Sequence, residues 1–444
     1  MLPKFILTRL WRRVLVRQRL KLYLTSNDLF SCRLVCRDLA TQLEPVLFED
    51  ITIRFRCRSL SRPSRVSALE RIGRHIQQVT FAIAHTAETF LPPVIDADTG
   101  KEQTFVYTPQ HQQRSPKSPK YGTWEMTDLL VKQYPPLFHT ATDIPSFVRV
   151  LSSMKNLCHL RITCEGQPPS HRYRRSAVDY ALISLRIAVE QVSLKFLNSL
   201  SLLSVHPAAV LYLQPNMGFG ASPASRKRWS QIRQLTIHME SFPYQAGSLT
   251  DHFKLLHGYL QSFPELQTLV FHWKGERSLS PVSLASEPCL RNPTNKRSRQ
   301  SDTSRGNWFL RPLKLPYLQE VELVNVVMDA SQVASFLFDH RKSLRELNFQ
   351  DVVLRTGTWD EALAPLTRIS GSDKWKQYQG HERSADVPIM LKPMTTQHSM
   401  RRGNHPVQRQ YQGPCSLATQ GEEHSWGRPD HMKRLAPSSA SCRR

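Results

Sequence analysis

The sequence predicts an α/β fold in which strands and helices alternate along the chain. Two observations carry this prediction. One short apolar frame recurs seven times, and segments with helical periodicity lie between the recurrences. No run of about 18 apolar residues occurs, so the sequence predicts no membrane-spanning helix.

The recurring frame is that of a short strand with one buried face. Each recurrence has an apolar residue, two others, an apolar residue, one other and a final apolar residue. The last two apolar positions are two residues apart, as on one face of a strand, and the first marks the turn into it. The triplets are Ile76/Val79/Phe81, Leu157/Leu160/Ile162, Leu197/Leu200/Leu202, Ile232/Leu235/Ile237, Leu266/Leu269/Phe271, Leu318/Val321/Leu323 and Leu344/Leu347/Phe349.

Helices are expected between these strands. Segments 143–157, 178–194, 248–263 and 329–344 have apolar residues at helical spacing. The last begins DASQ, with Asp329 at the expected N-cap and Gln332 three residues on. Strand and helix alternating at roughly 26 to 52 residues are typical of an irregular leucine-rich-repeat solenoid. An ordinary α/β domain with leucine-rich strands is the alternative.

Polar, proline-rich segments interrupt this pattern. We expect disordered inserts near 101–122, which holds two Ser-Pro-Lys triplets resembling proline-directed phosphorylation sites, and near 278–312. From residue 371 the periodicity ends. The predicted domains are a small helical module at 1–50, the repeat domain at 51–370 and a disordered basic tail at 371–444.

The net charge of +24 is concentrated in the ends and one insert. Residues 1–65 carry 14 Lys and Arg against 5 Asp and Glu, 371–444 carry 12 against 6, and 291–314 carry 7 against 1. Solvated basic tails explain this distribution, so nucleic acid is not the expected partner. The first 24 residues predict a basic amphipathic helix that packs on a partner or on the following helices; the alternatives are a mitochondrial presequence and a membrane-surface helix.

No pattern of catalytic or metal-ligating residues occurs. The sequence has no phosphate-binding loop, and neither HExxH, GxSxG nor paired CxxC motifs. Cys158 and Cys164 flank a predicted strand without a second ligand pair, so we expect thiols rather than zinc ligands, and no cofactor. The eight widely spaced cysteines favour a reducing compartment, the cytosol or nucleus.

The N-terminal region carries a family resemblance. The run DLFSCRLVCRDLATQLEPVLFEDITI (28–53) resembles the second half of an F-box, matching its pattern at Leu24, Asp28, Leu29, Cys32, Leu34, Val35 and Cys36. The first F-box helix is degenerate, because Leu2-Pro3 lies 25–26 residues before Asp28. With the repeats behind it, the chain up to about Lys376 resembles the F-box/leucine-rich-repeat-like proteins abundant in filamentous fungi.

This resemblance implies a non-catalytic substrate adaptor of an SCF-type cullin–RING ubiquitin ligase. The F-box would dock on the Skp-type linker subunit, and the repeats would bind a protein substrate. The linker-binding residues implied are Leu24, Asp28, Leu29, Leu34, Val35 and Cys36. The alternatives are a repeat-based interaction scaffold without ligase coupling, and a protein that associates with nucleic acid through its basic tails.

A second set of candidates follows from strand alternation. Residues between the apolar strand positions face away from the leucine core, on the surface where a solenoid binds protein ligands. Two histidines at equivalent positions could make binding pH-sensitive, or they could be ordinary solvent-facing residues. The substrate-binding candidates are Arg161, Thr163, Thr236, His238, His272, Glu322, Asn348 and Gln350. The substrate itself has no recognisable motif.

Overall fold

A computed structural model describes residues 13–92, 134–166, 176–207, 209–214, 223–241, 250–290, 310–366 and 390–391. Contacts divide the chain into a unit of residues 1–395 and a second of residues 396–444. The predicted disorder of 101–122 and the predicted tail lie outside the described residues, apart from the short strand at 390–391. The domain boundaries at 50 and 370 stay predictions.

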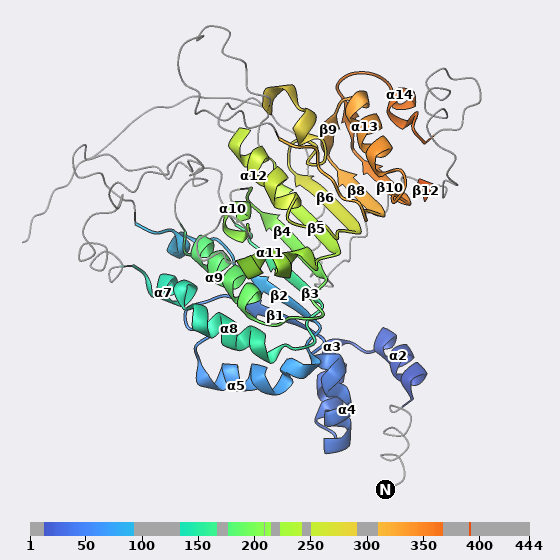
Figure 1. Cartoon of the computed structure of the whole chain (residues 1–444). Coiled ribbons are helices and arrows are strands. Elements are labelled where there is room, and N and C mark those ends of the chain that lie inside the picture. The colour runs from blue at the N-terminus through green and yellow to red at the C-terminus, as the bar shows by residue number, and fades with distance from the viewer. Residues whose placement is uncertain are drawn as a thin grey trace, which may run out of the picture. The chain divides into compact units, whose positions relative to one another are not determined.

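The apolar triplets lie in neighbouring strands of one parallel sheet. Among the described residues this sheet has nine strands, and their order across the sheet is their order along the chain (Figure 1). The edge strands β1 and β12 do not pair with each other, so the sheet is open. The strands are β1 (Asp50–Arg54), β2 (Gln78–Ala82), β3 (His159–Thr163), β4 (Ser199–Val205), β5 (Gln234–Glu240), β6 (Thr268–Lys274), β8 (Glu320–Val324), β10 (Glu346–Gln350) and β12 (Met390–Leu391).

The register aligns the seven triplets side by side. The middle members form one row across the sheet, from Val79 in β2 to Leu347 in β10, and the last members form the next, from Phe81 to Phe349. Every triplet residue is buried except Phe349, which is partly buried. Each such side chain contributes about 1.5–3 kcal/mol when removed from water, so these rows are the main source of stability. The predicted strands are confirmed.

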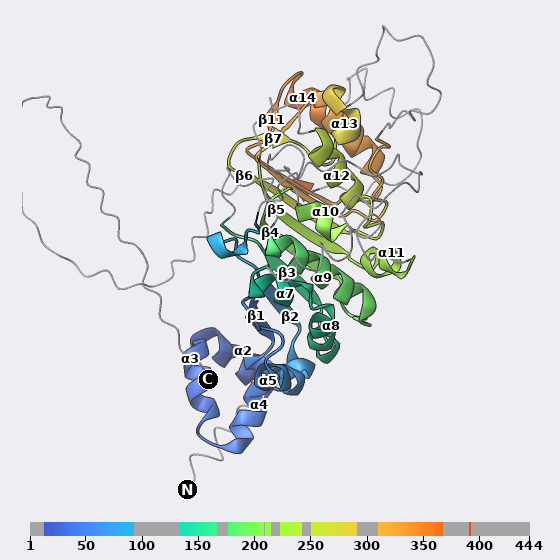
Figure 2. The same ribbon diagram turned by 90° about the vertical axis from the view of Figure 1, so that its left-hand side faces the viewer.

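Helices follow the strands and cover the apolar side of the sheet (Figures 1 and 2). The predicted helices are found, with ends within a few residues. Ser176 and Asp329 cap the helices that begin at Ala177 and Ala330. The helices after β1 are α5 (Pro63–Ile72), α7 (Pro136–Thr142), α8 (Ile144–Ser153), α9 (Ala177–Gln191), α10 (Ala209–Leu213), α11 (Pro223–Ser230), α12 (Thr250–Leu260), α13 (Ala330–His340) and α14 (Trp359–Leu363), with short 3₁₀ turns η1 (Gly73–His75) and η2 (Ala87–Thr89).

A second, three-stranded parallel sheet extends the last units of the fold. Its order is β11 (Val353–Leu354), β9 (Val326–Met328) and β7 (Ser278–Leu279). The chain turns out of each main strand through a left-handed residue, at Gly275 (φ 90°), Asn325 (φ 62°) and Asp351 (φ 52°). The Asn325 amide donates hydrogen bonds to the carbonyl oxygens of Trp273 (3.1 Å) and Gly275 (2.9 Å), which ties one turn to the turn before it.

Part of the insert expected to be disordered is folded. Residues 278–290 form β7 and two 3₁₀ turns, η4 (Leu284–Ser286) and η5 (Pro288–Leu290). Leu279, Leu284 and Leu290 are buried in the main core. The polar composition of the insert comes from residues after 290, and these up to 309 lie outside the described residues.

The predicted fold class of an F-box-like module followed by an irregular leucine-rich-repeat solenoid is corrected to a parallel α/β sheet with alternating helices. The asparagine turn that characterises leucine-rich repeats is not repeated, because the equivalent positions beside Asn325 hold Gly275 and Asp351. The apolar frame requires only a strand with one buried face and a tight entry turn, and that pattern by itself does not specify a leucine-rich repeat.

Within the described residues, two of the N-terminal helices pack as a pair around a small core. Helix α3 (Ser26–Arg33) packs on α4 (Arg37–Leu47) around Leu29, Leu39 and Leu43. In α2 (Val14–Tyr23) the side chains of Leu15, Leu22 and Tyr23 are about three-quarters exposed. Residues 14–23 of the predicted basic helix are therefore helical, but these three side chains do not join the core; residues 1–12 lie outside the described range.

None of the helices in the described ranges is both long and apolar enough to cross a bilayer.

Candidate functional site

The side of the sheet away from the helices presents two in-register rows of polar and small side chains. We call these two rows the strand face. The first row is Thr52, Thr80, Arg161, Ser201, Thr236, Val270, Glu322 and Asn348, and the second is Arg54, Ala82, Thr163, Leu203, His238, His272, Val324 and Gln350.

All eight substrate-binding candidates lie in these rows. Arg161, Thr236, Glu322 and Asn348 belong to the first row, and Thr163, His238, His272 and Gln350 to the second. Each is partly exposed. The structure thus brings them to one face because strand alternation and parallel register act together. Whether they bind a partner stays a prediction.

Four of the candidates form a connected group in the middle of the strand face. The imidazole rings of His238 and His272 are stacked, with centroids 4.3 Å apart and planes at 6°. The Nε2 atom of His272 lies 2.8 Å from Oε1 of Glu322, and the Asn348 amide donates to the other carboxylate oxygen at 3.2 Å. Burial lowers the pKa of His238 to about 4, helped by the charges of His272 and Lys274 and opposed by Glu322. His238 is therefore neutral near pH 7.

A second polar group, which sequence reasoning missed, lies nearer β1. The Nε2 atom of His159 is 2.8 Å from the Ser201 hydroxyl. Burial lowers the pKa of His159, as does the charge of Arg161, whereas Asp50 opposes the shift. Both residues occupy the alternate strand positions that identified Arg161, so the same alternation could have found them.

The six residues implied as linker contacts do not share one surface. Leu29 is buried between α3 and α4, and Leu24 and Cys36 pack partly against the same small core. Leu34 and Val35 are exposed in the turn between these helices, at 87% and 51% of their surface. Asp28 caps α3: it accepts hydrogen bonds from the Thr25 hydroxyl and backbone N–H, which lower its pKa.

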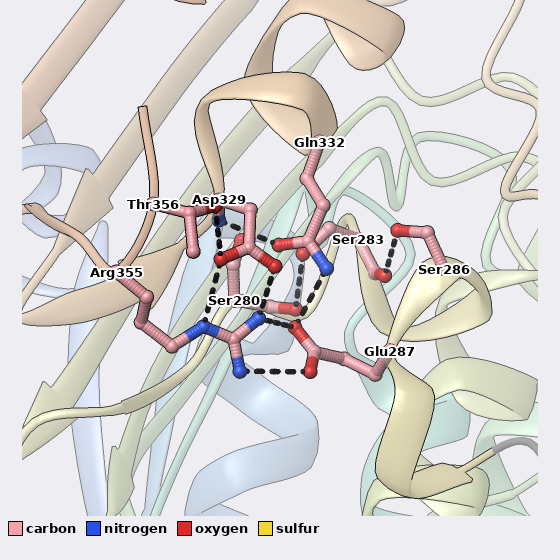
Figure 3. A network of polar contacts seen from close by, with 8 residues as sticks. All are labelled: Ser280, Ser283, Ser286, Glu287, Asp329, Gln332, Arg355 and Thr356. Atoms are coloured by element: carbon pink, nitrogen blue, oxygen red, sulfur yellow. Dashed lines mark hydrogen bonds and ion pairs between the residues drawn. The ribbon is translucent and has the colours of Figure 1, made fainter. Parts of the chain in front are cut away.

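A charged network joins the folded insert to the last strand–helix unit (Figure 3). Arg355 donates to both oxygens of Glu287, at 3.0 and 2.7 Å, and to both oxygens of Asp329, at 3.2 and 2.7 Å. Glu287 is fully buried, and it also accepts from the Gln332 amide at 2.8 Å. Burial alone would lower the pKa of Arg355, but the two carboxylates outweigh it and raise that pKa. The network holds three separate segments together.

A smaller buried network of polar side chains lies between α9 and α11. Arg186 donates to both oxygens of Glu190 at 3.1 Å, and the Trp229 indole and Ser225 hydroxyl also donate to that carboxylate. All four side chains are buried. The Arg186–Glu190 pair lies within α9, and the Trp229 and Ser225 contacts join α11 to it, so these contacts have a structural role.

Within the described ranges, no group of three or more His, Cys, Asp or Glu side chains could hold a metal ion. Cys164 is buried, and burial raises the pKa of its thiol. Cys158 is partly buried and also free. The buried Cys164 is therefore a poor nucleophile, because its thiol stays protonated.

Comparison with known proteins gives little. No family model matches the chain, and no curated protein matches it. A solved structure described as a D-tagatose 3-epimerase-like protein aligns with 79% of this chain and 95% of its own length, at 8% sequence identity and a TM-score of 0.20. At that TM-score the likeness carries no argument about the fold or the chemistry of this chain.

These comparisons correct the predicted family. No F-box or leucine-rich-repeat family model matches the chain. We withdraw membership of the filamentous-fungal F-box group, the role of SCF substrate adaptor, and the alternatives of a leucine-rich-repeat scaffold and a nucleic-acid-associated protein. The assignment as a non-enzyme is withdrawn too, because it depended on the adaptor role. Whether the chain binds a protein partner stays a prediction. The resemblance covers only half of an F-box. Any pair of helices with leucines and cysteines at those spacings would show the same pattern, so the pattern is not specific to that family.

Proposed function

We propose that the strand face is a binding surface for a protein partner. One observation carries the proposal: the helices of the described residues cover only one face of this all-parallel sheet (Figures 1 and 2). Parallel sheets are normally covered on both faces by helices, and their strands then read as continuous apolar runs. Here the strands alternate, with buried residues toward the helices and partly exposed polar ones on the strand face.

The chemistry of the strand face suits a polypeptide. Thr, His, Asn and Gln side chains both donate and accept hydrogen bonds, as peptide groups do. The rows repeat at the strand spacing of about 4.8 Å and run across seven or more strands, whereas small molecules are held in enclosed pockets. A long, shallow and mostly uncharged surface therefore favours an extended partner.

A photo-cross-linking residue at Val270, in the centre of the first row, tests the proposal. The full chain carrying it is expressed and irradiated, and the adducts are identified by mass spectrometry. The matched control places the same residue at Arg149, an exposed position on α8. We expect a small, reproducible set of protein adducts from position 270 that position 149 does not give.

The same experiment can contradict the proposal. Identical adducts from both positions, or adducts that disappear after nuclease treatment, would show that the strand face does not select a protein. A Thr236→Arg variant supplies a second test, because a bulky cation beside position 270 should abolish the adducts.

We also propose a reducing compartment for the protein. Cys32, Cys36, Cys57, Cys158 and Cys164 are free thiols, in keeping with a cytosolic or nuclear location.

A further inference from the structure

The proposed protein partner can be specified further from the charges on the strand face. We infer that the partner segment is an extended polypeptide lying across the strands, with an acidic side chain over Arg161 and a basic side chain over Glu322. This inference rests on the proposed function.

The charge of the strand face differs between its two ends. Arg54 and Arg161 lie in β1 and β3, within the two rows, and one acid, Asp50 of β1, lies on the same side. Beyond the central strands, β8 and β10 carry Glu320, Glu322 and Glu346 on the same side and no lysine or arginine. One end is therefore mainly basic and the other acidic.

One register row connects the two ends. Arg161 pairs in turn with Ser201, Thr236, Val270 and Glu322. The three residues between the charged ends have short, uncharged side chains, so a chain can lie along the row between a guanidinium and a carboxylate. The stacked imidazoles of the second row flank this path.

The length of this path sets the spacing in the partner. Four steps between neighbouring strands separate Arg161 from Glu322, and each step is about 4.8 Å, so the two ends are roughly 19 Å apart. An extended chain advances about 3.3 Å per residue. The acidic and basic residues of the partner should therefore be about six positions apart.

Both charged side chains are partly exposed on the strand face, where Glu322 also contacts His272 and Asn348. Arg161 uses one nitrogen, Nη1, for two long contacts, 3.4 Å to the Thr80 hydroxyl and 4.0 Å to Asp50. The side chains of Arg161 and Glu322 are 32% and 28% exposed. Charges placed in this way fix register and discriminate between partners more than they add affinity. The charge pattern should therefore control which sequences bind and in which direction.

The test selects peptides from a random display library on the immobilised full chain. Peptides that also bind a Thr236→Arg/Val270→Arg variant are removed, which leaves those that need the strand face. We expect the survivors to be enriched in an acidic and a basic residue about six positions apart. An Arg161→Glu/Glu322→Arg variant should select the same spacing with the signs reversed, and should bind the original peptides roughly tenfold more weakly.

A matched control reverses a pair elsewhere. Arg149 and Glu70 form an exposed ion pair of 2.8 Å between α8 and α5, and Arg149→Glu/Glu70→Arg should leave the selection unchanged. Circular dichroism and urea midpoints confirm that each variant is folded. If the reversal on the strand face unfolds the chain, Arg161→Gln and Glu322→Gln replace it, and each should remove the preference at its own end.

The outcomes separate the two proposals. Peptides that need the strand face but lack the charge spacing would overturn this inference and leave the proposed function standing. Peptides enriched only in acidic residues would also overturn it, since Glu322 would then have no part. If no peptide depends on the strand face, both proposals fail.

Discussion

Replacing Arg355 by methionine should lower the free energy of unfolding by about 3 kcal/mol. The guanidinium makes four charge-assisted hydrogen bonds to Glu287 and Asp329 (Figure 3), and Glu287 is fully buried. Removing one partner of a buried ion pair costs about 3–5 kcal/mol, because the remaining charge stays out of water. Arg355 and Asp329 are 25% and 18% exposed, so water can reach part of the site and the lower end of that range applies.

Urea denaturation of the full chain measures this loss. Urea is uncharged and does not screen the ion pairs, and the shift in midpoint multiplied by the slope gives the change in free energy. Arg149→Met is the matched control, because it also removes an arginine from a 2.8 Å ion pair. The side chains of Arg149 and Glu70 are 63% and 42% exposed, so the loss of free energy should not exceed about 1 kcal/mol.

A rescue variant tests the cause. Arg355→Met combined with Glu287→Met removes the buried charge together with its partner, and apolar replacement of a buried pair is often neutral. The double variant should therefore recover most of the loss. The reasoning would be refuted if Arg355→Met lost no more than Arg149→Met, or if the double variant were less stable than Arg355→Met alone.

Two further predictions concern the core and pH. Leu202→Ala removes a buried side chain and should cost about 2–5 kcal/mol in urea denaturation. Leu203→Ala changes the next residue, which lies on the strand face, and should cost about 1 kcal/mol or less. Equal losses would contradict the assigned faces. Buried His340 accepts a hydrogen bond from the Leu315 N–H at Nε2 and contacts the Phe336 carbonyl through Nδ1. Burial lowers its pKa, opposed by Phe336 and Asp339, so the unfolded state binds more protons below pH 6.5. The contribution of His340 to the free energy of unfolding is complete above that pH and falls below it by up to about 1.4 kcal/mol per pH unit. His340→Gln should reduce this fall. An unchanged dependence of the free energy of unfolding on pH would exclude this role.

Much of the fold could be predicted because its signals are local. A strand with one buried face needs apolar residues two apart, and Leu200 and Leu202 show this spacing as clearly as any pair. Helix starts such as Asp329 with Gln332 are also local, since the capping hydrogen bonds span three residues. The folded segment 278–290 was missed because its few apolar residues, Leu284 among them, have no regular period.

The candidate site was predictable only in part. Alternation placed Arg161, His238 and Glu322 on one face, because side-chain direction follows from position within a strand. It did not reveal which of them touch. His238 and His272 are 34 positions apart in the chain, and their stacking depends on the register of β5 against β6.

The sequence by itself determined where the strands and helices lie and which strand residues face away from the core, since both depend on periodicity within one segment. Only the tertiary structure decided that the strands pair in chain order, that Arg355 meets Glu287 from 68 positions away, and that Arg161 and Glu322 lie four strands apart in the same row. Those pairings come from packing between distant segments, for which a single sequence carries no periodic signal. The family resemblance did not hold because a local helix pattern specifies an amphipathic surface and not the protein to which it belongs.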